Sequence, residues 1–135
     1  MHASDLISED EPVVDEAALA RLRALAQDVA EAEEDVVSEL LRTFQSDAEV
    51  RIRSFAAALT GADGEGAADA VHALKGASAT IGARRLSALC AALERWARRG
   101  DDLSALEGGV ALLERELSAA TKALAQGLTE RQEGG

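Results

Sequence analysis

Residues 35–60 read DVVSELLRTFQSDAEVRIRSFAAALT, and their apolar side chains recur at steps of three and four. This spacing is typical of an amphipathic α-helix, because residues three and four apart share one helical face. We therefore predict one long helix over about 35–60 with a single buried face. That face comprises Val37, Leu41, Phe44, Ala48, Ile52, Phe55 and Leu59.

The sequence that follows predicts two further helices, each ended by glycine. GADGEG at 61–66 ends the long helix and reverses the chain. A helix over about 67–81 is followed by Gly82, and a helix over about 84–99 is followed by Gly100. Glycine suits the residue just past a helix end, because it adopts the left-handed conformation at low cost.

Helices are also expected on either side of this segment. Asp15 is a suitable N-cap for a short first helix with apolar residues at three- and four-residue steps. Leucines at near-heptad spacing predict a last helix from about Leu103 onward. Gly108 and Gly109 interrupt that pattern, so its first turn is expected to be separate or kinked.

Together these helices predict an all-α protein, an antiparallel four-helix bundle with a short additional N-terminal helix. The 30 Ala and 18 Leu residues favour helix, and the scarcity of β-branched and aromatic residues argues against a sheet. We expect a flexible acidic tail over 1–14, the bundle over 15–127 and a frayed C-terminal tail over 128–135.

The charge is unevenly distributed along the chain. The net charge is −11, and residues 1–50 alone hold 14 acids and 3 bases, while the 11 acids and 11 bases of 51–135 cancel. The balance reverses over 72–100, where six bases accompany the single acid Glu94. The sequence pI of about 4.6 argues against a nucleic-acid partner, yet one segment is cationic.

Several other classes of protein are excluded by the composition. The lone Cys90 permits neither a disulfide framework nor a thiolate metal cluster. No apolar run is long enough to span a membrane, and the acidic start does not resemble a signal peptide. We therefore expect a cytoplasmic protein that works as a monomer.

The segment most informative about function is AVHALKGASATIGA, residues 70–83. On a helical wheel, His72 lies opposite a predicted core stripe, and its own face carries one lysine and otherwise only small residues. Gly76 in mid-helix costs about 0.5–1 kcal/mol relative to Ala, so stability gives no reason for it. The predicted core stripe is Val71, Leu74, Ser78 and Ile81, and the predicted face around His72 is Ala68, Lys75, Gly76 and Ala79.

A histidine with this surround suits phosphoryl transfer. Neutral imidazole is a nucleophile near neutral pH, Lys75 supplies positive charge, and the small residues give a partner access. A plain surface histidine is the alternative for His72 taken alone. His2 lies in the predicted tail and is expected to be a bystander.

HALKGASATIGA, residues 72–83, resembles the signature of histidine-containing phosphotransfer (HPt) domains of phosphorelays. The pattern LSALCAALE at 86–94 continues the likeness, which covers roughly 15–126. The resemblance implies that His72 accepts a phosphoryl group from a receiver aspartate, or donates it to one. By the same resemblance Lys75 assists the phosphoryl group and Gly76 clears space for the partner.

Other polar residues are expected near the partner interface. The resemblance places Glu94 and Arg98 near the histidine, although the two are four residues apart on one helix and can pair with each other. A docking role for Arg84, Arg85 and Arg98 stands beside the alternative that these bases balance the acidic second helix.

The implied function is a phosphocarrier of bacterial two-component signalling, whose partners are receiver domains, a histidine kinase, or both. There is no nucleotide-binding loop, so self-phosphorylation is not expected. No cofactor of its own is implied, because the receiver would bring Mg²⁺. The alternatives are a non-catalytic module that docks and sequesters a receiver or kinase, and the phosphoacceptor bundle of a chemotaxis-type kinase.

Overall fold

The computed structural model describes residues 7, 10–28, 36–100 and 102–134. These residues form helices joined by short loops, with no strand in the described part of the chain. The helices are α1 (Glu16–Asp28), α2 (Val36–Thr60), α3 (Gly64–Ile81), α4 (Arg84–Arg99), the 3₁₀ turn η2 (Leu103–Leu106) and α5 (Glu107–Gly134).

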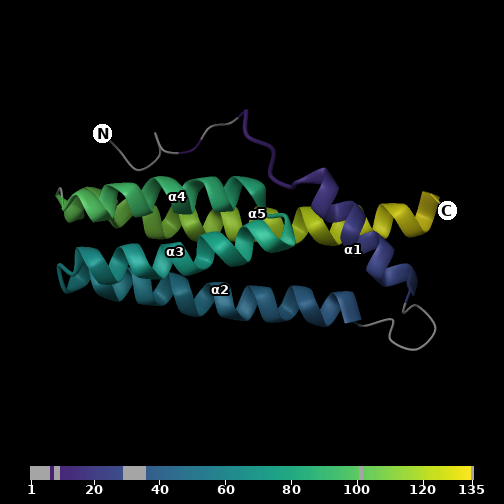
Figure 1. The fold of residues 1–135 in the computed structure, drawn as a ribbon, viewed down its shortest axis with the longest axis horizontal. Coiled ribbons are helices and arrows are strands. Elements are labelled where there is room, and N and C mark those ends of the chain that lie inside the picture. The colour runs from purple at the N-terminus through teal and green to yellow at the C-terminus, as the bar shows by residue number, and fades with distance from the viewer. Residues whose placement is uncertain (1–6, 8–9, 29–35, 101, 135) are drawn as a thin grey trace.

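The four longer helices lie side by side along the long axis of the molecule (Figure 1). Short turns at 61–63 and 82–83 reverse the chain, so α3 runs antiparallel to both α2 and α4. Helix α1 crosses the C-terminal half of α5 at an angle. The predicted all-α bundle with a short N-terminal helix is confirmed. None of the described helices is long and apolar enough to cross a membrane.

The core lies where the predicted apolar stripes face one another. On α2, Phe44, Ala48, Ile52 and Phe55 are buried, as the spacing predicted, and Leu59 is half-buried. Each fully buried leucine contributes about 1.5–3 kcal/mol by leaving water. The largest apolar side chains that are almost completely buried are Phe55, Leu74, Leu86, Leu89, Leu93, Leu106, Leu113 and Leu124.

The ends of α3 and α4 show why their boundaries fall where they do. Helix α3 begins at Gly64, three residues before the predicted start, because the Asp63 side chain accepts a hydrogen bond from the Gly66 N–H at 2.9 Å. Gly82 ends it with φ = 93° and donates its N–H to the carbonyls of Ser78 and Ala79. Its role past the helix end is confirmed, and Gly100 repeats it after α4 with φ = 71°.

The chain between α4 and α5 also agrees with the sequence pattern. Residues Leu103–Leu106 form a separate 3₁₀ turn, and the α-helix begins at Glu107. Asp102 begins the turn by accepting hydrogen bonds from the Ser104 N–H and hydroxyl. The separate first turn that the glycine pair predicted is therefore present, and both glycines lie inside the first turn of α5.

Val13 and Val14, which the sequence placed in a flexible tail, pack against the bundle instead. Val13 and Val14 are half-buried against the core, and the Val13 carbonyl accepts a hydrogen bond from the Arg85 N–H at 3.4 Å. The Asp15 N–H donates to the Gly82 carbonyl at 2.8 Å. Apolar side chains in an otherwise acidic segment account for this docking. Residues 1–6 and 8–9 lie outside the described residues.

The predicted frayed C-terminal tail over 128–135 stays a prediction, although part of this range is helical. Helix α5 continues through 128–134, and Leu128 is half-buried against the core. Arg23 on α1 donates from Nε and Nη2 to the Gly127 carbonyl, at 3.3 and 3.0 Å. These hydrogen bonds join α1 to α5 at the predicted boundary at 127.

Candidate functional site

Helix α3 exposes a narrow stripe of side chains, because it packs against both α2 and α4. The stripe runs through Asp69, His72, Gly76 and Ala79, all of them exposed. The side chain of His72 is 60% exposed. The residues predicted to lie opposite His72, including Leu74 and Ser78, are buried. The helical wheel therefore oriented α3 correctly.

The prediction that Ala68 lies on the face of His72 was wrong. Ala68 is completely buried, and Asp69 is exposed beside it. The wheel assumes that half of a helix faces solvent, whereas α3 is covered on two sides and exposes a smaller arc. Asp69 was missed, although its position three residues before His72 places it on the same side of the helix.

Glu94 on α4 faces His72 across the seam between α3 and α4. His72 Nδ1 lies 2.9 Å from Glu94 Oε2, and Lys75 Nζ donates to Glu94 Oε1 at 2.8 Å. The Glu94 side chain is only 12% exposed. The predicted docking role for Glu94 is therefore corrected: its carboxylate is turned inward, toward His72 and Lys75.

The ionisation of Glu94 determines which nitrogen of His72 carries the proton. The hydrogen bond from Lys75, helped by those from Arg98 and His72, lowers the pKa of Glu94 to about 2 against the opposing effect of burial. An ionised carboxylate only accepts hydrogen bonds, so His72 Nδ1 must be the donor. In the neutral imidazole the lone pair then lies on Nε2.

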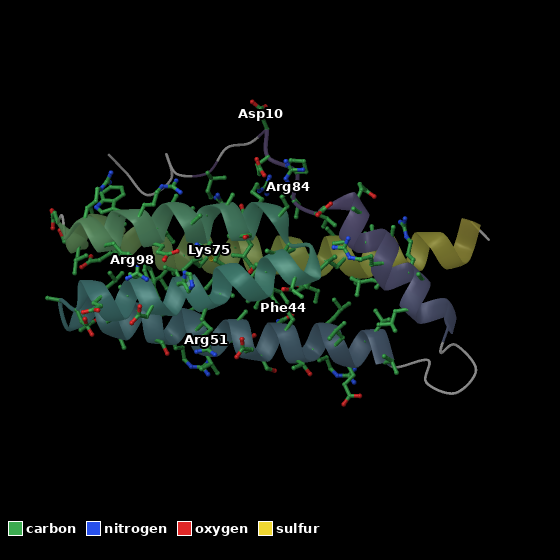
Figure 2. All side chains as sticks on the ribbon, in the orientation of Figure 1. Asp10, Phe44, Arg51, Lys75, Arg84 and Arg98 are labelled. Carbon is green, nitrogen blue, oxygen red and sulfur yellow. The ribbon has the colours of Figure 1, made fainter. Side chains whose placement is uncertain are left out.

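Arg98 contacts both Glu94 and Asp69, the first residue of the exposed stripe. Its Nε donates to Glu94 Oε2 at 3.2 Å, and its Nη2 lies 3.1 Å from the same oxygen and 3.4 Å from Asp69 Oδ1. Figure 2 shows Lys75 and Arg98 over the seam between α3 and α4. The pairing of Glu94 and Arg98 that the sequence allowed is present together with the contact of Glu94 to the histidine.

Gly76 lies on the exposed stripe, one turn after His72. A Cβ atom built on it would meet nothing within 4 Å. The fold therefore does not require glycine at this position, and its energetic cost in mid-helix is unexplained by packing within the chain. The open space above Gly76 keeps the approach to His72 clear.

Arg84 and Arg85, predicted to dock a partner, have partners within the chain. Arg85 Nε donates to Glu116 Oε1 at 2.7 Å, and the Glu116 side chain is 2% exposed. Arg85 therefore joins α4 to α5, which corrects its docking role. Arg84 pairs with Glu11 at 2.8 Å and stays 53% exposed, near the end of α4 away from Arg98 (Figure 2). Neither Glu11 nor Glu116 belongs to α2, so these two ion pairs do not support the alternative that the arginines neutralise the acidic charge of α2.

Two other kinds of chemistry can be assessed at the site. Burial raises the pKa of the Cys90 thiol to about 12, so this core cysteine is not a thiolate nucleophile near neutral pH. Within the described residues, no three His, Cys, Asp or Glu side chains gather in an arrangement that could hold a metal ion. Among the described residues, the site therefore offers neither a reactive thiolate nor a cluster of metal ligands.

Comparison with known proteins agrees with this geometry. The family model of the Hpt domain matches residues 39–126. The chain belongs to the Hpt domain family. The fold is similar to the crystal structure of histidine-containing phosphotransfer protein B (HptB) from Pseudomonas aeruginosa PAO1, with a TM-score of 0.69 and 34% sequence identity. The alignment covers 90% of this chain and 96% of HptB. No curated protein matches the chain.

The family assignment makes this Hpt domain a histidine phosphotransfer protein of phosphorelay signalling. The matched range contains α3, α4 and nearly all of α2, and so contains the residues that surround His72. Of the two histidines in the sequence, His72 alone lies within that range.

Proposed function

We propose that His72 is the phosphoacceptor of this Hpt domain and exchanges a phosphoryl group with the aspartate of a receiver domain. The observation that carries the proposal is the hydrogen bond from His72 Nδ1 to the ionised Glu94, because it leaves the Nε2 lone pair for attack. The exposure of His72 and the open space over Gly76 support access by a large partner.

The transfer step needs no proton from solvent. His72 Nε2 attacks the phosphorus of the aspartyl phosphate, the N–P bond forms, and the P–O bond breaks with its electron pair leaving on the aspartate. Nδ1 keeps its proton, so the phosphorylated ring carries a positive charge. The Glu94 carboxylate lies 2.9 Å from that nitrogen and neutralises the charge. The reverse reaction follows the same path.

Lys75 is proposed to stabilise the phosphoryl oxygens. An ammonium group has three N–H donors, and the hydrogen bond to Glu94 uses one of them. The Lys75 side chain is 34% exposed and lies three residues after His72, on the same side of α3. Its ammonium group therefore shares the Glu94 carboxylate with His72 and keeps two N–H donors for phosphoryl oxygens.

The partner is proposed to bring the remaining parts of the reaction. Its acidic site would hold Mg²⁺, which neutralises charge on the transferring phosphoryl group when bound. Receiver domains, and a histidine kinase at another step of the relay, are the proposed partners. We further propose that the chain works as a monomer in the cytoplasm; sedimentation of the purified protein tests the monomer.

The test is transfer from a receiver domain phosphorylated with acetyl phosphate in Mg²⁺. The parent chain and the control His2→Gln should both take up label, and His72→Gln should take up none. Label on His72→Gln equal to the parent would refute the assignment. Unchanged binding of the receiver to His72→Gln, with no transfer to the parent, would instead support a docking module.

A further inference from the structure

The exposed carboxylate of Asp69 is unexplained by the proposed mechanism. It lies on α3 three residues before His72, and its side chain is 69% exposed. Side chains at this spacing share one side of a helix, with Cβ atoms about 5–6 Å apart. The phosphoryl group that His72 would carry has two negative charges, so Asp69 places a like charge beside it.

Asp69 also engages Arg98, a cation near the site. Arg98 Nη2 lies 3.4 Å from Asp69 Oδ1 and 3.1 Å from Glu94 Oε2. With neutral His72, the charges of Lys75 and Arg98 cancel those of Glu94 and Asp69. Removal of the Asp69 charge would leave this group with one net positive charge and would free one side of Arg98 for a phosphoryl oxygen.

We propose that Asp69 sets the phosphoryl-transfer equilibrium by destabilising phosphorylated His72. Repulsion of the phosphoryl group and retention of Arg98 act in the same direction, and both favour passage of the group to the receiver. The inference rests on the proposed role of His72. Asp69 would then set the fraction of the Hpt domain that is phosphorylated at equilibrium, without contacting the transferring atoms.

The chain offers a matched control at Glu65. Glu65 is also exposed on α3, seven residues before His72, which is about 10 Å along a helix axis. Glu65→Gln makes the same change in net charge as Asp69→Asn, farther from His72. A general effect of charge on receiver binding would therefore appear in both variants.

The experiment measures the equilibrium ratio of phosphorylated Hpt domain to phosphorylated receiver, with the receiver domain that labels the parent chain. Asp69→Asn and Asp69→Ala should shift the ratio toward the Hpt domain by about threefold or more at low salt, and the shift should shrink at high salt. Asp69→Glu and Glu65→Gln should stay near the parent ratio.

Two results would overturn the inference: a parent-like ratio in both Asp69→Asn and Asp69→Ala, or an equal shift in Glu65→Gln. Unfolding midpoints of all variants establish that they are folded, as expected for an exposed position. Failure of the His72 assignment is distinguishable, because His72→Gln would then still take up label. Failure of the Asp69 inference alone would leave the parent labelled and His72→Gln unlabelled, and it would appear only in the ratios measured for the Asp69 and Glu65 variants.

Discussion

Glu94 and His72 meet across the seam between α3 and α4, with Glu94 Oε2 2.9 Å from His72 Nδ1. Lys75 and Arg98 also donate hydrogen bonds to the Glu94 carboxylate. The ionised carboxylate therefore accepts from Nδ1 and leaves the lone pair of the neutral imidazole on Nε2, the nitrogen proposed to receive the phosphoryl group. In the proposed mechanism, α3 supplies the nucleophile and α4 supplies the carboxylate that orients it.

Substitution of Glu94 should slow phosphoryl transfer without removing the acceptor. Glu94→Ala deletes a hydrogen bond to a charged group, worth about 1.5 kcal/mol or more, and so should lower the transfer rate about tenfold. Glu94→Gln should lose less, since its amide oxygen can still accept from Nδ1. Rapid-quench transfer from a phosphorylated receiver measures both rates, and parent-like transfer by Glu94→Ala would exclude the orienting role.

Two substitutions of Gly76 separate its effect on the access of a receiver to His72 from its effect on the stability of the fold. Gly76→Ala should stabilise the fold by about 0.5–1 kcal/mol in urea unfolding, because nothing lies near the added methyl group. Gly76→Gln should fold normally but accept phosphoryl from a receiver at least about tenfold more slowly, since its side chain disturbs the close approach.

Phosphoramidate, a small phosphoryl donor, serves as the control for Gly76→Gln. It needs no protein surface, so its reaction with Gly76→Gln should match that with the parent within about twofold. Equal slowing with both donors would mean that the substitution damages His72 itself, and equal rates with the receiver would mean that Gly76 does not provide access.

Arg85 and Arg84 should differ in their contribution to stability. Arg85→Met leaves the buried Glu116 carboxylate without its close partner and should lower the free energy of unfolding by about 2–3 kcal/mol. Arg84→Met breaks a largely exposed pair with Glu11 and should cost less than about 1 kcal/mol. Urea unfolding of the two variants measures the difference. Equal losses would show that the Arg85–Glu116 pair has no special structural role.

Acid should remove the stability that Glu94 contributes. The folded-state pKa of about 2 lies below the ordinary value of 4.5. A group with a lowered folded-state pKa stabilises the protein fully above its unfolded value, and this contribution is lost as the pH falls from about 4.5 toward about 2. The difference in unfolding free energy between the parent and Glu94→Gln should be constant near neutral pH and shrink over that window. A difference that grows with acid would contradict the sign.

Much of the fold follows from local pattern and glycine placement. The apolar stripe of α2, the boundaries of α4 and the roles of Gly82 and Gly100 depend on neighbours within a few residues, so the sequence predicts them directly. The docking of Val13 and Val14 depends on contacts with distant segments. Composition alone therefore does not predict that Val13 and Val14 pack against the bundle.

The site was predictable to a similar extent. His72, Lys75 and Gly76 lie within five residues on one helix, so a helical wheel brings them together. The wheel fails at Ala68 because it does not include the second neighbouring helix. The partners of Glu94 and Arg85 depend on pairing between helices: Glu94 lies 22 residues from His72, and Arg85 lies 31 residues from Glu116. Local pattern does not specify which charges meet at such separations.

The position of the phosphoryl group on the protein tests the proposed role of His72 Nε2. Phosphorus–nitrogen coupling in an NMR spectrum of the ¹⁵N-labelled, phosphorylated chain identifies the nitrogen bonded to phosphorus. We predict a single phosphohistidine at His72, with the phosphoryl group on Nε2 and Nδ1 still protonated. Phosphorus on Nδ1, or on any residue other than His72, would contradict it.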